Sequence, residues 1–254
     1  MSDFISPEVN ASALKTSREY VCWIDIMGTK NIMSESLQKA TNFILKFHSC
    51  VIRSIKEDSE KIHYYPLMDG IFITTPQLLI MQKAVNSIFS NAANIFLHER
   101  QNIHRFIIKG SLAYGPIYHG NIINDSVCHE IASNDNYKKT ILLGMPMIQA
   151  FTTEKAAPPF GIYIHESARQ YQHLQGRYYK WRNSTIDTDK LQAKIESYFN
   201  WCDKYSEYLE LDPQKIARYK KLTNEYFSKR DSEDEESQTK IDPSLSEEQN
   251  PSNV

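Results

Sequence analysis

The order of strand-like and helix-like segments between residues 21 and 118 constrains the fold more than any other feature. Apolar runs and segments rich in aromatic or β-branched residues predict strands, and apolar residues at a spacing of three or four predict helices. The segments are, in order, a strand at 21–27, a helix at 31–57, strands at 61–66 and 70–75, a helix at 76–100 and a strand at 105–118. This order predicts a ferredoxin-like βαββαβ arrangement, an α+β sandwich in which one sheet carries both helices on one face.

The rest of the chain adds smaller elements to this unit. Residues 120–140 are polar and predict a loop. A strand, a turn at Gly144, a short helix and a further strand are expected to follow up to residue 165. Our predicted division of the chain is a flexible arm at 1–18, a main domain at 19–185, a helical extension at 186–228 and a tail at 229–254. We expect the tail to be disordered because it holds three basic and eight acidic residues and almost no apolar ones.

Composition indicates an ordinary soluble globular protein. Hydrophobic residues make up 41% of the 254 and charged residues 24%, and with a net charge of −2 no basic stripe stands out that would predict nucleic-acid binding. The four cysteines are scattered, which argues against a structural zinc site or a disulfide framework. Residues 1–20 lack the apolar core of a signal peptide, and no later run is long enough to span a membrane. We therefore expect a cytoplasmic protein without a nucleic-acid or membrane partner.

Two aspartates lie where strands of the predicted sheet end. Asp25 interrupts the apolar run VCWIDIMG, in which Gly28 would turn the chain, and Asp69 lies at the tip of the predicted hairpin. An unpaired buried carboxylate is costly, so we expect a cation beside Asp25. Adjacent strands could bring the two carboxylates together, and Mg²⁺ or Mn²⁺ prefers such oxygen ligands. The alternative is that each aspartate is an ordinary turn or cap residue.

Four segments carry a resemblance to a known family. In order and spacing, WIDIMG, YYPLMDGIFIT, IIKGSLAYG and LLGMPMIQAFTTEKA resemble the class III nucleotide cyclase domain, over residues 19 to 166. Within that superfamily they look most like the pyrimidine cyclases of the Pycsar antiphage system, bacterial enzymes that make cyclic UMP or cyclic CMP.

The resemblance implies a two-metal site and a mechanism. Asp25 and Asp69 would be the metal ligands, assisted by the backbone carbonyl of Ile26, with Gly28 in the same substrate-binding segment. A metal-activated ribose 3′-oxygen would attack the α-phosphorus and expel pyrophosphate. Lys109 would bind the triphosphate where the pyrimidine cyclases tend to carry arginine, unless it is a lysine that reaches from a strand to solvent.

The resemblance also implies which positions read the base. The residue four before the second aspartate is lysine in adenylate and glutamate in guanylate cyclases, and here it is Tyr65. The second purine-reading position falls on the apolar Ile141. Neither purine reader is present, which favours a pyrimidine, although Tyr65 could instead simply pack on its hairpin neighbours. Arg105 is a further candidate for substrate binding.

One departure from the family pattern bears on activity. Purine cyclases carry an asparagine and an arginine on the helix after the later glycine, and these positions are here Ile148 and Thr152. Other groups would have to stabilise the negative charge that develops in the transition state.

We therefore predict a homodimeric pyrimidine nucleotide cyclase that uses two Mn²⁺ or Mg²⁺ ions and converts UTP, or CTP, at sites between the subunits. Its product would activate a separate effector. The alternatives are a nucleotide-binding regulatory module without turnover and a purine cyclase with unusual base contacts.

Overall fold

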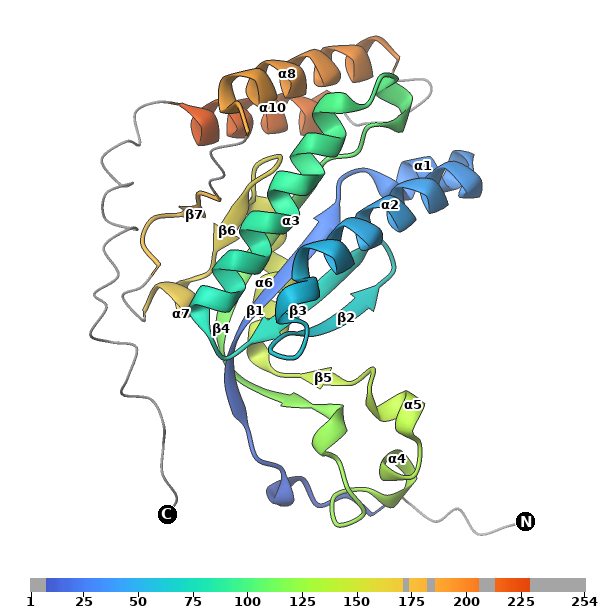
Figure 1. Ribbon diagram of the computed structural model, residues 1–254, viewed down its shortest axis with the longest axis vertical. Helices are drawn as coiled ribbons and strands as arrows, with labels where there is room; N and C mark the ends of the chain where they lie inside the picture. The colour runs from blue at the N-terminus through green and yellow to red at the C-terminus, as the bar shows by residue number, and fades with distance from the viewer. Residues whose placement is uncertain (1–7, 171–173, 182–185, 206–212, 229–254) are drawn as a thin grey trace.

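The strand β1 (Ser17–Ile26) lies in the interior of the sheet and has a long neighbouring strand on each edge. In the computed structural model, which describes residues 8–170, 174–181, 186–205 and 213–228, β1 runs antiparallel to β3 (Gly70–Thr75) on one side and to β4 (Ile108–His119) on the other (Figure 1). The hairpin partner of β3 is β2 (His63–Leu67). The resulting order β2-β3-β1-β4 is that of a ferredoxin-like βαββαβ sheet, so the predicted α+β fold class is confirmed.

Three short strands extend the sheet beyond β4. One of them, β6 (Ile162–Ile164), pairs with β4 in parallel, and β7 (Tyr178–Tyr179) pairs with β6. The third, β5 (Leu142–Leu143), pairs with the end of β4. The described part of the chain thus forms one seven-stranded sheet.

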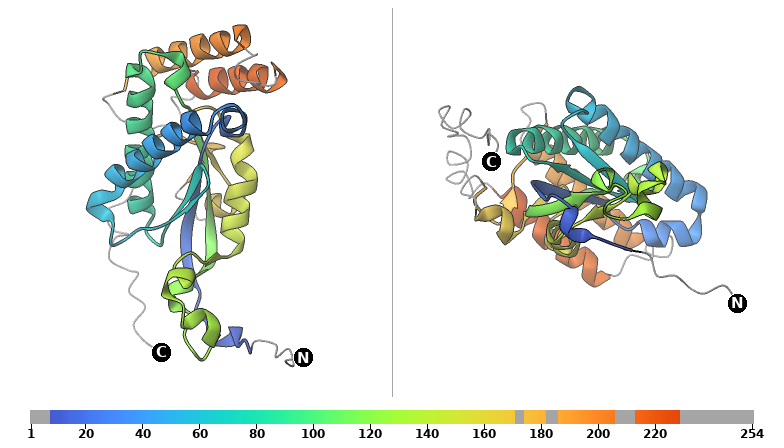
Figure 2. Two further views of the ribbon diagram at one scale, coloured as in Figure 1. Left: turned by 90° about the vertical axis from the view of Figure 1, so that its right-hand side faces the viewer. Right: turned by 90° about the horizontal axis from the view of Figure 1, so that it is seen from below.

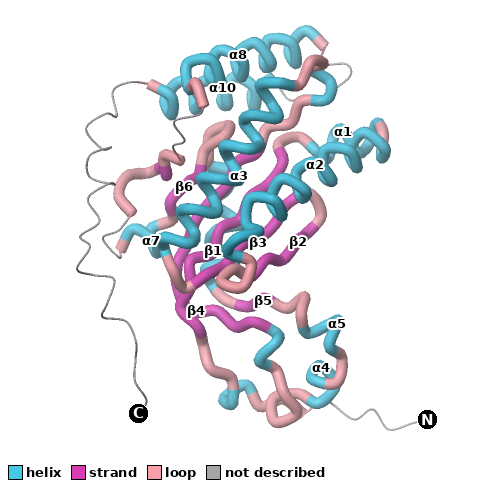
Figure 3. The backbone as a smooth tube through the Cα atoms, viewed as in Figure 1, coloured by secondary structure: helices cyan, strands magenta, loops and turns pink. Residues whose placement is uncertain are grey.

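Helices of very different length surround this sheet (Figure 3). The longer ones are α1 (Thr29–Glu35), α2 (Leu37–Ile55), α3 (Leu78–His98), α6 (Met145–Thr153), α8 (Thr188–Lys204) and α10 (Pro213–Phe227). The single turns are α4 (His129–Ala132), α5 (Asp135–Lys138) and α7 (Glu166–Arg169), with 3-10 turns at Ala11–Ala13, Lys56–Asp58, Asn102–His104, Gly120–Ile122 and Glu154–Ala156.

The two faces of the sheet are covered by different helices. With the sheet seen edge-on in Figure 2, α2 and α3 lie on one side of it and α6 on the other. Because side chains alternate along a strand, Cys22 and Ile24 of β1 enter the α2–α3 core, whereas Val21 and Trp23 pack in a smaller cluster with α6. Asp25 therefore belongs to the α6 face.

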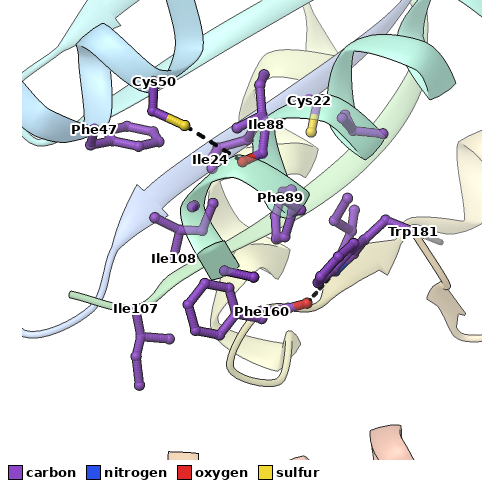
Figure 4. Close-up of a cluster of buried hydrophobic side chains, with 14 of the residues drawn as sticks. Cys22, Ile24, Phe47, Cys50, Ile88, Phe89, Ile107, Ile108, Phe160 and Trp181 are labelled. Carbon is purple, nitrogen blue, oxygen red and sulfur yellow. Dashed lines mark hydrogen bonds between the residues drawn. The ribbon is translucent and has the colours of Figure 1, made fainter. Parts of the chain in front are cut away.

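The larger core fills the space between α2, α3 and the sheet. Figure 4 shows Phe47 and Cys50 of α2 facing Ile88 of α3, with Ile24 of β1 beneath them. The Cys50 thiol donates a hydrogen bond to the Ile88 carbonyl at 3.7 Å. These side chains are at most 4% exposed, so they anchor both helices to the strand that carries Asp25.

Two sequence predictions about local structure are wrong. A single helix was expected over 31–57, but the chain is extended at Ser36, whose hydroxyl accepts a hydrogen bond from the Lys39 amide and begins a new helix, α2. A loop was expected over 120–140, but this stretch contains the short helices α4 and α5 and a 3-10 turn. The helix expected over 76–100 is present as α3.

The terminal regions differ in how much of them is described. The Asn10 amide donates to the Val127 carbonyl at 2.9 Å, and Leu14 packs on a small cluster that includes Val127, so this part of the predicted arm contacts the 120–140 segment. The helical extension is present as α8 and α10, which lie together at the end of α3 (Figure 1). Residues 1–7 and the predicted disordered tail lie outside the described residues.

Among those described, no helix combines the length and apolar character needed to cross a bilayer.

A first prediction concerns Gly70, whose backbone lies against Trp23. A Cβ atom at this position would lie 2.3 Å from two atoms of the Trp23 ring and 2.9 Å from the Ile24 carbonyl oxygen. We expect Gly70→Ala to displace the indole and to lower the free energy of unfolding by about 1–3 kcal/mol, measured by urea denaturation.

The control for this prediction is the same change in a Trp23→Phe background, where the clashing ring atoms are absent. There the cost of Gly70→Ala should be smaller. An equal cost in both backgrounds would show that the indole is not the cause.

Candidate active site

Asp25 and Asp69 lie at the ends of neighbouring strands. Asp25 is the next-to-last residue of β1, and its register partners are Gly70 of β3 and Lys109 of β4. Asp69 directly precedes Gly70, in the tight turn between β2 and β3, where Met68 adopts a left-handed conformation with φ 54°. Strand pairing therefore brings the two acidic residues to the same end of the sheet.

The pKa of Asp25 reports the proximity of other charges. The pKa is raised from 3.8 to about 7, chiefly by burial and then by the negative charges of Asp69 and Glu154. The charge of Lys109 and a hydrogen bond from the Ile26 amide act in the opposite direction without cancelling the rise. In this arrangement Asp25 holds a proton at acidic pH and begins to lose it near neutrality.

Lys109 forms a buried ion pair in place of the free cation expected from the sequence. Its Nζ lies 2.8 Å from Oε1 of Glu154, and it also lies over the ring of Tyr219 in α10, 5.3 Å from the centroid. Burial lowers the pKa of Lys109, but the attraction of Glu154 and Tyr219 outweighs this, so that the pKa is raised. At 5% exposure, Lys109 does not reach solvent, and its charge is matched before any anion arrives.

Glu154 is a site residue that sequence reasoning missed. It follows α6 directly and is 8% exposed. Its partner lies 45 positions earlier in the chain, on the strand that α6 crosses. The quoted motif LLGMPMIQAFTTEKA contains Glu154, but nothing in its spacing reveals that α6 packs against β4, so no sequence signal links this acid to Lys109.

The oxygen atoms at the end of β1 fit a divalent cation. The carboxylates of Asp25 and Asp69 and the carbonyl of Ile26 supply hard ligands of the kind that Mg²⁺ and Mn²⁺ prefer. The Ile26 carbonyl accepts one hydrogen bond, from the Thr29 hydroxyl at 3.3 Å, and Gly28 turns the chain there with φ 81°. Within the described residues no three His, Cys, Asp or Glu side chains form a metal-binding group. A cation here would take its other ligands from water or a bound phosphate.

Tyr65 belongs to a second polar network on the same face of the sheet. Its hydroxyl lies 2.6 Å from Nδ1 of His119, and Nε2 of His119 lies 2.9 Å from Glu19. The Tyr65 ring also packs on the cluster that contains Trp23 and Phe72. The packing expected as an alternative for Tyr65 is therefore present together with a polar contact, and sequence reasoning did not indicate His119 or Glu19 as its partners.

Arg105 requires a correction, because the structure gives it a structural role. Its guanidinium donates to the carbonyls of Phe96 and Glu99, at the end of α3, and at 2.9 Å to the side chain of Asn102. It is 4% exposed. Arg105 thus satisfies the last carbonyls of a helix and is not available to bind a substrate.

The positions where purine cyclases carry polar groups lie in apolar surroundings or on the surface. Ile141 packs against a small cluster that includes Ile123. Ile148 is 49% exposed on the outer face of α6, and the Thr152 hydroxyl donates to the Ile148 carbonyl at 2.8 Å. Neither α6 position presents a cation for phosphate.

No protein-family model and no curated protein matches this chain. Among solved structures, the guanylyl cyclase domain of the RhoGC fusion protein from the aquatic fungus Blastocladiella emersonii is 16% identical, with 62% of this chain and 85% of that chain covered and a TM-score of 0.46. The guanylate cyclase domain of RhGC from Catenaria anguillulae, in complex with GTP, is 18% identical over 62% and 83%, with a TM-score of 0.46. A bacterial light-regulated adenylyl cyclase is 13% identical over 65% and 48%, with a TM-score of 0.49. At these levels the likeness carries no functional argument.

A second prediction follows from the raised pKa of Asp25. Between pH 4 and 7 the unfolded chain loses the Asp25 proton while the folded chain keeps it, so Asp25 makes the folded state less stable as the pH rises. We expect Asp25→Asn to stabilise the metal-free protein by roughly 2–4 kcal/mol at pH 8, with the gain falling by about 1.4 kcal/mol per pH unit below pH 7. Denaturant unfolding of both proteins in the presence of EDTA, at several pH values, measures this difference in stability.

The matched control is Asp125→Asn, which alters an exposed aspartate paired with His129. It should show no such gain above pH 7. A stability difference between wild type and Asp25→Asn that does not change with pH would contradict the raised pKa.

Proposed function

We propose that this protein is a class III-type nucleotide cyclase that converts a pyrimidine nucleoside triphosphate, UTP or CTP, to its 3′,5′-cyclic monophosphate and pyrophosphate. In this reaction the ribose 3′-oxygen bonds to the α-phosphorus and the bond to pyrophosphate breaks. The observation that carries the proposal is the electrostatic coupling of Asp25 and Asp69 at the ends of neighbouring strands. Two carboxylates that repel each other in a partly buried place are stabilised by a divalent cation.

The residues of the chain take separate roles in this proposal. Asp25, Asp69 and the Ile26 carbonyl would hold two Mn²⁺ or Mg²⁺ ions, which would stabilise charge on the attacking and leaving oxygens. Gly28 lets the chain turn away so that the carbonyl is accessible. Lys109 acts through its neighbours, because its charge lowers the pKa of Asp25 and holds Glu154 in place. Tyr65 contacts the base.

A homodimer is proposed because large apolar side chains lie exposed beside the site. On α6, Met145, Ile148 and Phe151 are 59%, 49% and 52% exposed, and on the β2–β3 hairpin Met68 is 83% exposed. Exposed apolar residues gathered in this way are typical of protein interfaces. We propose that a second copy covers them and completes the site.

The proposed product is a second messenger. It would act on a separate cyclic-nucleotide-activated effector, in the manner of antiphage defence, and the enzyme would work in the cytoplasm. The main competing function is a nucleotide-binding regulatory module without turnover. Two residues of α6 favour it, because neither offers a phosphate ligand. Ile148 is apolar, and the Thr152 hydroxyl already donates to the Ile148 carbonyl. A purine cyclase with unusual base contacts is a further alternative.

A third prediction tests the activity directly. We expect purified protein incubated with Mn²⁺ and each of the four ribonucleoside triphosphates to form cyclic UMP or cyclic CMP, detected by mass spectrometry. Asp69→Ala should lower turnover at least about 100-fold, because the metals lose a ligand while the hairpin turn keeps its backbone.

The control variant is Asp125→Ala, an exposed aspartate far from the site in sequence, which should retain activity. Nucleotide binding without product would favour the regulatory module, and cyclic AMP alone would remove the role given to Tyr65. Unchanged turnover in Asp69→Ala would contradict the two-metal proposal. Thermal denaturation adds a readout without turnover, because Mn²⁺ should raise the Tm of wild type and not of Asp69→Ala.

A fourth prediction concerns the dimer. Ile148→Glu places a charge in the exposed apolar area of α6, and we expect it to yield a monomer with little activity, since buried unpaired charges destabilise interfaces. Analytical ultracentrifugation measures the assembly. The control is Leu45→Glu, at a side chain that is 59% exposed on α2, on the opposite face of the sheet. A dimeric and active Ile148→Glu would rule out this interface.

A further inference from the structure

A chain of hydrogen bonds crosses the sheet from β1 through β4 to β2. Glu19 and His119 are 3% and 6% exposed, so both are cut off from water. Oε1 of Glu19 lies 2.9 Å from Nε2 of His119, and Nδ1 of His119 lies 2.6 Å from the Tyr65 hydroxyl. The ring of His63 lies beside that of His119, with centroids 4.3 Å apart. Tyr65, at the β2 end of these hydrogen bonds, is partly exposed.

In the hydrogen bond between Glu19 and His119, only one of the two groups can be the donor. Burial raises the pKa of Glu19, but hydrogen bonds from His119, Thr74 and Ser17 outweigh it and the pKa is lowered. The carboxylate is therefore ionised at neutral pH and can only accept hydrogen bonds. Its second oxygen already accepts the Thr74 hydroxyl at 2.7 Å. Nε2 of His119 must then carry a hydrogen and donate it to Glu19.

The direction of the second hydrogen bond follows from the first for the neutral form of the His119 imidazole. A neutral imidazole with its hydrogen on Nε2 has a bare Nδ1, which can only accept. Burial and, to a smaller extent, the charge of Glu19 raise the pKa of Tyr65 to about 12, so its phenol keeps its single proton. The Tyr65 hydroxyl therefore donates this proton to Nδ1 of His119. The Tyr65 oxygen is left with lone pairs alone for any other partner.

We infer that Glu19 and His119 are positioning residues that make Tyr65 a hydrogen-bond acceptor toward the nucleotide base. The inference rests on the proposed function, and it deepens it by giving a reason to prefer one pyrimidine. An acceptor pairs with the N3–H of uracil, whereas cytosine presents a lone pair at N3, and two facing acceptors repel. Tyr65 lines an open pocket of about 190 Å³ with His63, Asn121 and Lys139, so a ligand can reach its side chain.

The hydrogen-bond direction can be measured without any turnover. In the ¹⁵N NMR spectrum of the wild-type protein at pH 8, His119 should show a protonated Nε2 and a bare Nδ1. The signals are identified as those lost in His119→Phe, one of eight histidines being changed. An imidazolium, or a hydrogen on Nδ1, would overturn the inference, because Tyr65 would then be free to donate.

The kinetic test compares UTP with CTP. Glu19→Gln can donate to Nε2, which moves the imidazole hydrogen to Nδ1 and releases the Tyr65 proton, and His119→Phe removes the partner altogether. In both variants we expect the ratio of kcat/KM for UTP to that for CTP to fall by about tenfold. The same exchange at the histidine of an exposed histidine–carboxylate pair, His129→Phe, should leave the ratio unchanged.

The two readouts separate this inference from the proposed function. A merely structural role of the hydrogen-bond chain would lower activity with both nucleotides equally, so an unchanged ratio in Glu19→Gln and His119→Phe would overturn the inference while cyclase activity stood. If wild type cyclises no nucleotide, the proposed function fails. The NMR experiment still decides whether Tyr65 donates its proton to His119.

Discussion

The register of β1 between its two neighbours is the constraint on which the rest of the structure depends. It sets Asp25 opposite Gly70 on one side and Lys109 on the other. A slip by one residue would turn Asp25 into the α2–α3 core and bring an apolar neighbour to the site face. The register is held from both sides, because Cys22 and Ile24 are fully buried under the two long helices while Trp23 packs over Gly70.

That register also separates two polar networks along one strand face. Glu19 lies near the start of β1 and Asp25 near its end, with the apolar side chains of Val21 and Trp23 between them under α6. The charges that shift the pKa of Asp25 all belong to its own end of the strand. The two roles that we propose, a cation and phosphate site at one end and a directional hydrogen bond at the other, would therefore not disturb each other electrostatically.

The sequence predicts what is local and misses what depends on how elements cross. The βαββαβ order, the hairpin with Asp69 at its tip and the turn at Gly28 follow from spacing and residue type, and the structure has all three. The break at Ser36 was missed because the apolar spacing continues through it. Glu154, His119 and Glu19 could not be found, since their partners lie on strands or helices far away in the chain. Arg105 was misjudged for the same reason, because its partners are backbone carbonyls.

The charge balance around Asp25 explains why a cation suits this site better than a free lysine does. Asp69 and Glu154 act on Asp25 as negative charges, and Lys109 acts on it as an opposing positive charge. That lysine is paired with Glu154 at 2.8 Å, so it does not offset the negative charges around Asp25 in full. Without a cation, the least costly response is for Asp25 to keep a proton, which is what a pKa of about 7 means. A divalent ion bound here, as we propose, would remove that need. Proton and metal would then compete for the same carboxylate, and metal affinity would weaken as the pH falls below neutrality.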